Sequence, residues 1–118
     1  MPLIEIHLDA ELCQAKSDQI GQAVHDAQIE VLDIPPVDRF QLFQPHPPGE
    51  LRFDPTYGGV DRQSLVLIKI TMVARYPVAL KRALFEAIAT RLELVGIRHQ
   101  DLLICVTENH YEDWYTGS

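Results

Sequence analysis

The second residue of this sequence, Pro2, is a position at which an unusual chemical group can arise. Pro2 directly precedes an alternating apolar pattern, Leu3 to Leu8, which is typical of a strand. If Met1 is removed after synthesis, the ring nitrogen of Pro2 becomes a secondary amine at the N-terminus. A terminal amine has a reference pKa of about 8, which burial or neighbouring cations lower towards the range of a base at neutral pH. Pro2 is therefore a candidate general base, and a proline that merely begins a strand is the alternative interpretation.

The composition predicts one globular domain, since the chain has 118 residues of which 47% are hydrophobic and 23% charged. We expect no membrane span and no secretory signal, because no apolar run approaches about 18 residues and no basic region precedes an apolar stretch. Cys13 and Cys105 are interpreted as reduced thiols of a cytoplasmic protein. The formal net charge of −7 disfavours nucleic acid as a partner, because a phosphate backbone requires a basic surface.

The elements that must position Pro2 follow one plan twice. The first half predicts a strand at about 3–8, a helix at about 17–32 and a strand at about 39–44. Ser17 is the candidate N-cap, and the prolines at 35 and 36 end the helix. The expected apolar face of this helix comprises Ile20, Ala23, Val24, Ala27 and Val31.

The second half predicts a strand at about 65–73, a helix at about 77–95 and a strand at about 102–107. Pro77 fits the first turn of this helix, and Gly96 fits the position after its end. The offset between the halves is 62 residues in both pairs of strands, from Leu3 to Leu65 and from Phe40 to Leu102. We therefore expect a single domain over 1–118 made of pseudo-repeats at about 1–60 and 61–118, joined by a Pro- and Gly-rich connection.

Two β-α-β units predict an α/β (α+β) fold, with a four-stranded mixed sheet and both helices on one face, because such crossovers are right-handed. The other face of the sheet then needs cover. The segment Leu65-Val66-Leu67-Ile68 is apolar at consecutive positions, which is typical of a strand buried on both faces. We therefore expect a homo-oligomer in which the open sheet faces pack together.

Short motifs spread over nearly the whole chain accompany this plan: Met1-Pro2-Leu3, His25-Asp26-Ala27, Asp38-Arg39-Phe40-Gln41, His46-Pro47-Pro48-Gly49-Glu50, Glu108-Asn109 and Asp113-Trp114. Together they resemble the tautomerase superfamily, and within it the malonate semialdehyde decarboxylase group. The resemblance implies a tautomerase-like β-α-β fold and a homotrimer with active sites near the subunit boundaries.

The resemblance also implies roles for the residues that match. Pro2 matches the catalytic proline, and Asp38 matches the acid that orients or activates water or substrate. Arg75 matches one of two carboxylate-binding arginines, and Trp114 matches an aromatic pocket wall. Arg39 is a further substrate-binding candidate, because some tautomerases borrow an arginine from a neighbouring subunit, and a surface ion pair with Asp38 is its alternative.

The second carboxylate-binding arginine of the family is absent. Val73 stands in its place, two residues before Arg75 and on the same strand face if the strand extends that far. Two cations hold and polarise a small carboxylate better than one cation does. This departure therefore favours a tautomerase over a decarboxylase.

Each of these residues also has an ordinary structural interpretation. Asp38 can cap a turn, Arg75 can be a solvated charge, and Trp114 can belong to a core or an interface. His25, at the polar border of the first helix stripe, and His46 are interpreted as structural. The candidates for a pocket mouth are His110, Tyr111 and Tyr115.

The sequence thus predicts a cofactor-independent keto-enol tautomerase of small 2-oxo acids, in which Pro2 transfers the proton, Arg75 holds the carboxylate and Asp38 orients the hydroxyl. No metal or cofactor is required, because the amine supplies the base and the arginine supplies the complementary charge. One alternative is a lyase or hydratase resembling malonate semialdehyde decarboxylase, in which a cationic Pro2 polarises the carbonyl of a 3-oxo acid. Another is a catalytically silent oligomeric binding protein, which follows if Met1 stays attached and the Pro2 nitrogen remains an amide.

Overall fold

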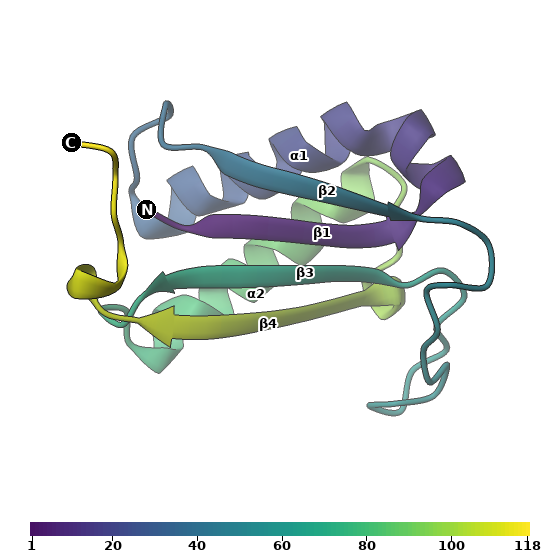
Figure 1. Ribbon diagram of the computed structural model, residues 1–118. Helices are drawn as coiled ribbons and strands as arrows, with labels where there is room; N and C mark the ends of the chain where they lie inside the picture. Colours follow the sequence, from purple (N-terminus) through teal and green to yellow (C-terminus); the bar gives the residue numbers. More distant parts are fainter.

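The computed structural model describes residues 1–118 and contains one sheet and two long helices (Figure 1). Both halves have the predicted order of strand, helix and strand. Neither helix is both long and apolar enough to cross a membrane. The elements are β1 (Leu3–Asp9), α1 (Ala10–Leu32), β2 (Phe40–His46), β3 (Val66–Val73), α2 (Val78–Leu94) and β4 (Leu102–Asn109), with short 3-10 helices η1 (His99–Asp101) and η2 (Tyr111–Asp113).

The sheet is mixed and has the strand order β2-β1-β3-β4, which confirms the predicted fold. The pairs β1–β2 and β3–β4 are parallel, and the two halves meet through the antiparallel pair β1–β3. Leu3 stands opposite Phe40 on one side and Thr71 on the other, while Val73 stands opposite Asn109. The starts of β1 and β2 and the ends of β3 and β4 therefore lie at one edge of the sheet, where Figure 1 also shows both termini.

Both helices cover the same face of the sheet (Figure 1). Along β1 the side chains of Ile4, Ile6 and Leu8 are fully buried beneath the helices, and those between them are half-buried on the opposite face. The even-numbered positions of β3 up to Met72 repeat this alternation. The core thus lies between the sheet and the helices, and the other sheet face carries no layer of this chain.

Helix α1 begins at Ala10, seven residues before the expected start at Ser17. The residue that precedes it is Asp9, whose side chain makes no capping hydrogen bond. Good helix formers occupy most of the positions between Asp9 and Ser17, and no Gly or Pro interrupts them. The helix therefore continues back to the end of β1, and the N-cap signal at Ser17 was misleading.

The ends of the other elements follow local chemistry. Strand β2 extends to His46 through Pro45, which an edge strand tolerates because it needs only one row of hydrogen bonds. Helix α2 ends at Leu94, and Gly96, which has a φ of 90°, follows the cap residue Val95 as predicted. The amides of Gly96 and Ile97 donate to the carbonyls of Glu93 and Leu92, which is the Schellman pattern.

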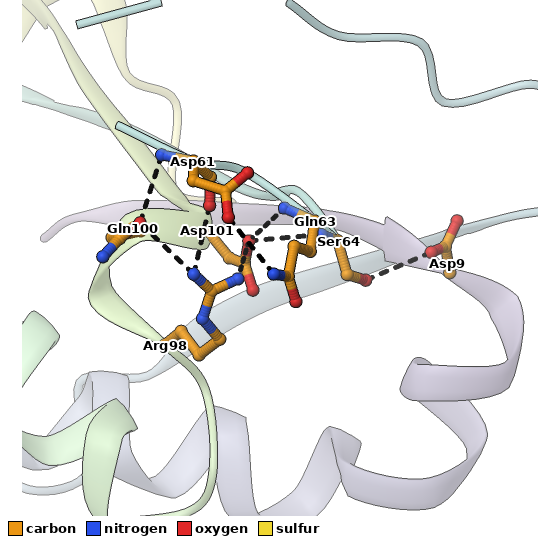
Figure 2. A network of polar contacts seen from close by, with 7 residues as sticks. All are labelled: Asp9, Asp61, Gln63, Ser64, Arg98, Gln100 and Asp101. Atoms are coloured by element: carbon orange, nitrogen blue, oxygen red, sulfur yellow. Dashed lines mark hydrogen bonds and ion pairs between the residues drawn. The ribbon is translucent and has the colours of Figure 1, made fainter. Parts of the chain in front are cut away.

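The long connection between β2 and β3 is tied down at the sheet edge opposite Pro2 (Figure 2). The buried carboxylate of Asp101 accepts hydrogen bonds from the amides of Gln63 and Ser64, at 2.7 and 3.2 Å. The hydroxyl of Ser64 donates to Asp9 at 3.2 Å. This network anchors the connection to the start of β4 and the end of β1, away from the residues with candidate chemistry.

Candidate active site

The candidate residues of four separate segments lie at the same edge of the sheet. Pro2 stands one residue before β1, and Asp38 stands two residues before β2. Arg75 follows β3, and Trp114 follows β4 and η2. Because β1 and β2 run parallel and both run against β3 and β4, this edge collects residues that are far apart in the sequence.

Asp38 lies beside the N-terminus. Its Oδ2 is 3.8 Å from the amine of Met1, and Pro2, the next residue of the extended chain, is buried. The amide of Asp38 donates to the carbonyl of Pro35 at 2.9 Å, which closes a turn just ahead of β2. Asp38 therefore does form part of a turn, and the same turn brings its carboxylate to the N-terminal amine.

His25 is buried inside the protein rather than at a polar border, with 3% of its surface exposed. Its Nε2 lies 2.7 Å from the carbonyl oxygen of Pro36. The segment between α1 and β2 folds over this part of the helix and covers the imidazole, which helical spacing alone does not reveal. The structural interpretation of His25 is in keeping with this burial.

Arg75 is exposed and lies two residues beyond the end of β3. Its guanidinium carbon is 4.9 Å from the centre of the Tyr76 ring, and it forms no ion pair with an acidic side chain. The nearby Lys81 is instead paired with Glu108 at 3.1 Å. Arg75 thus presents an unpaired positive charge in an open hollow of about 470 Å³ that these residues line.

Val73 is the last residue of β3 and is 8% exposed. Because the strand ends here, the alternation that would place Val73 and Arg75 on one strand face does not reach Arg75. An arginine at position 73 would therefore have to extend from a largely buried position. Arg75 is therefore the arginine that this edge of the sheet presents after β3.

Trp114 is held by Asn109, a residue to which sequence analysis gave no separate role. The indole Nε1 donates to Asn109 Oδ1 at 2.8 Å, and the Asn109 carbonyl accepts from the amide of Ala74 at 2.8 Å. Asn109 therefore connects the aromatic side chain to the segment that carries Arg75. The available signal was an amide side chain at a strand end, five residues before the only tryptophan.

Arg39 makes its hydrogen bonds away from Asp38. Its Nη1 donates to Gln22 at 3.0 Å and its Nε donates to Gln41 at 3.2 Å, so the side chain lies across α1 and β2. No ion pair joins Arg39 to Asp38 within this chain. Arg39 is exposed, which leaves it accessible to another subunit.

The remaining candidate residues lie at the two opposite ends of the strands. His46 lies at the end of β2, where its Nε2 is 2.9 Å from Nδ1 of His7. Burial, followed by the neighbouring His46, lowers the pKa of His7 below its usual value. The exposed residue Tyr111 begins η2, and the exposed residues His110 and Tyr115 lie close to its two ends, at the same edge as Pro2.

Comparison with known proteins identifies the class. A family model described as "Tautomerase enzyme" matches residues 38–117. The chain is also 30% identical over 120 residues to the probable tautomerase YusQ of Bacillus subtilis (strain 168), across 100% of this chain and 94% of that protein. The chain belongs to the tautomerase superfamily.

Solved structures place it near one group of that superfamily. FG41 malonate semialdehyde decarboxylase, in a structure inhibited by 3-bromopropiolate, is 35% identical with a TM-score of 0.91, covering 98% of this chain and 89% of that one. A second malonate semialdehyde decarboxylase, whose structures concern its decarboxylase and hydratase activities, is 26% identical with a TM-score of 0.90, covering 98% and 91%. The resemblance to this group is confirmed.

Proposed function

We propose that the protein is a cofactor-independent keto-enol tautomerase of small 2-oxo acids, and that removal of Met1 frees the Pro2 amine as its base. The observation that carries the proposal is the carboxylate of Asp38 at the start of the chain, where its Oδ2 lies 3.8 Å from the amine of Met1, the residue attached to Pro2. The unpaired Arg75 and the half-buried Trp114 at the same sheet edge give further support. Membership in the tautomerase superfamily agrees with it.

The proposed reaction moves one proton. Arg75 holds the substrate carboxylate through two parallel charge-assisted hydrogen bonds. The Pro2 amine takes the proton from the enol hydroxyl, and the electron pair left on oxygen forms the carbonyl. The electrons of the carbon-carbon double bond then take the same proton back from the Pro2 ammonium at carbon. Asp38 orients the hydroxyl by accepting a hydrogen bond from it before the transfer. The amine and the guanidinium supply all the charge that these steps require.

The first alternative is a lyase or hydratase that acts on a 3-oxo acid, as the solved malonate semialdehyde decarboxylases suggest. There Pro2 is a cation that polarises the carbonyl. The two mechanisms require opposite protonation states of the Pro2 amine, which is neutral in the tautomerase and charged in the decarboxylase. Val73 in place of an arginine disfavours the decarboxylase, because it removes a cation from the carboxylate site.

A second alternative is a binding protein without catalytic activity, and it depends on Met1. When Met1 is attached, the Pro2 nitrogen is an amide with no basic lone pair, although the Asp38 carboxylate still lies beside a terminal amine. The intact mass of the protein purified from its natural host distinguishes this case from the others.

The open face of the sheet supports assembly into a homotrimer. Phe40, Leu42 and Leu103 lie on the face without helices and remain 50%, 47% and 38% exposed. Among proteins of the same fold, a fused 4-OT forms a symmetric trimer, at 17% identity and a TM-score of 0.79. We infer that other copies of this chain cover the face, and sedimentation showing a monomer at micromolar concentration would exclude the trimer.

The assay that tests the proposed function compares two substrates. The specificity constant is measured for tautomerisation of phenylenolpyruvate and for decarboxylation of malonate semialdehyde, using protein from which loss of Met1 has been verified by mass. We expect the enol to be the better substrate. The matched control is the same protein with Met1 retained, which should be inactive on both. Equal enol turnover with and without Met1 would exclude Pro2 as the base.

A further inference from the structure

The side chain of His25 is held by a single polar contact. Its Nε2 lies 2.7 Å from the Pro36 carbonyl, and because a carbonyl oxygen only accepts, Nε2 carries the hydrogen. The other ring nitrogen, Nδ1, is buried and has no partner. A buried polar atom without a partner costs free energy, so a hydrocarbon side chain would satisfy the packing of this site at lower cost. The benefit of a histidine at this position must therefore come from its hydrogen bond to the Pro36 carbonyl.

That contact acts on the segment that carries Asp38. Pro35 and Pro36 have no amide hydrogens, so this segment has few donors of its own with which to fix itself. The amide of Asp33 bonds back to Ile29 at one end, and the amide of Asp38 closes the turn onto Pro35 at the other, at 2.9 Å. The imidazole of His25 is the contact that joins the middle of the segment to α1.

We propose that His25 is a positioning residue that fixes the turn at 35–38 and thereby holds the Asp38 carboxylate at the start of the chain, beside Met1 and next to Pro2. This inference rests on the proposed function for its catalytic consequence. His25 is 3% exposed and does not reach a substrate, so its action passes through Pro36 and Asp38. The consequence for the Pro2 amine is electrostatic, because a carboxylate held nearby stabilises the charged form of the amine.

The test compares a variant that removes the donor with one that keeps it. His25→Met fills similar space without a donor, and His25→Gln carries an amide that reaches about as far as Nε2. In His25→Met we expect kcat/KM for phenylenolpyruvate to fall roughly ten- to hundredfold, the size of a small misplacement at a catalytic group. The acidic limb of the pH profile, which reports deprotonation of the Pro2 amine, should move to lower pH, and hydrogen exchange at the Asp38 amide should accelerate. His25→Gln should restore most of the activity, the profile and the protection.

A double variant with Asp38→Asn tests whether His25 affects activity through Asp38. If His25 acts through Asp38, adding His25→Met to Asp38→Asn should cost little more activity, because coupled residues are not additive. Full additivity would overturn the proposal, and so would a folded His25→Met protein with unchanged exchange at Asp38 and an unchanged profile. If His25→Met does not fold, His25→Asn replaces it, since its shorter amide does not reach Pro36.

Failure of the proposed function is recognised separately. Wild-type protein without enol activity would remove the tautomerase assignment, while exchange at Asp38 and NMR titration of the N-terminal amine would still decide whether His25 holds the turn. Unchanged exchange and titration in His25→Met would then overturn the positioning role itself.

Discussion

Asn109 accepts a 2.8 Å hydrogen bond from the indole of Trp114, while its backbone carbonyl accepts from Ala74, next to Arg75. One residue at the end of β4 thus fixes an aromatic side chain and braces the segment with the candidate carboxylate anchor. The short helix η2 turns the chain back after β4 and returns Trp114 to the end of the strand. Asn109 then holds the indole there through the hydrogen bond.

We predict that Asn109→Leu loosens Trp114. The variant keeps the approximate size of the side chain and removes the acceptor, so KM for phenylenolpyruvate should rise roughly three- to tenfold, in line with loss of one hydrogen bond. The tryptophan fluorescence should shift to longer wavelength as the indole becomes hydrated. Asn109→Asp retains an acceptor and is the matched control. Unchanged fluorescence in Asn109→Leu would show that packing alone holds Trp114.

Arg75 should behave as an anion anchor rather than a solvated charge. Arg75→Ala should lose about 2 to 4 kcal/mol of transition-state stabilisation in kcat/KM, and Arg75→Lys should also be damaging because lysine offers no planar fork. Arg82→Lys, at an exposed position of α2, is the matched control. A collapse of the melting temperature with retained activity per folded protein would make Arg75 a structural residue. Arg39 of a neighbouring subunit would then become the first alternative.

Val73→Arg should raise decarboxylation of malonate semialdehyde relative to tautomerisation of phenylenolpyruvate, because it restores a second cation near the carboxylate. Val73 is only 8% exposed, so the variant should also melt at a lower temperature. Thr71→Arg, two residues earlier on β3, controls for an added charge. A well-folded Val73→Arg protein with both activities unchanged would show that the second cation does not decide between the reactions.

The His7–His46 contact predicts a pH dependence of stability. Because burial and His46 lower the pKa of His7 from 6.5, the unfolded chain binds a proton more readily than the folded one just below that pH. The contribution of His7 is therefore complete above about pH 6.5 and is lost as the pH falls through the folded pKa. Urea denaturation at several pH values should show this loss in wild-type protein and a smaller loss in His7→Gln. His99→Gln, at an exposed histidine, should retain the wild-type dependence.

The sequence predicted the sheet because its signals are local. Alternation at Ile4, Ile6 and Leu8 identifies the buried face of β1, and the repeated strand-helix-strand order predicts which ends share an edge. The start of α1 was wrong because a favourable cap residue at Ser17 says nothing about whether the preceding residues are also helical.

The positions of the candidate residues could be predicted in part, for reasons of the same kind. The sheet edge that gathers Pro2, Asp38 and Arg75 follows from topology once the strands are known. The contacts of His25 with Pro36 and of Trp114 with Asn109 depend on how a connecting segment and a short 3-10 helix fold back. No periodic pattern encodes such non-local contacts.

In the proposed reaction the Pro2 amine transfers the proton, and Pro2→Ala is the variant that probes this role. The variant keeps a terminal amine but makes it primary and more flexible, and the position before a strand tolerates the change without loss of the fold. With Met1 removed from both proteins, kcat/KM for phenylenolpyruvate should fall by roughly two to four orders of magnitude in Pro2→Ala, while the melting temperature stays unchanged. Unchanged turnover in a folded Pro2→Ala protein would show that Pro2 is not the base.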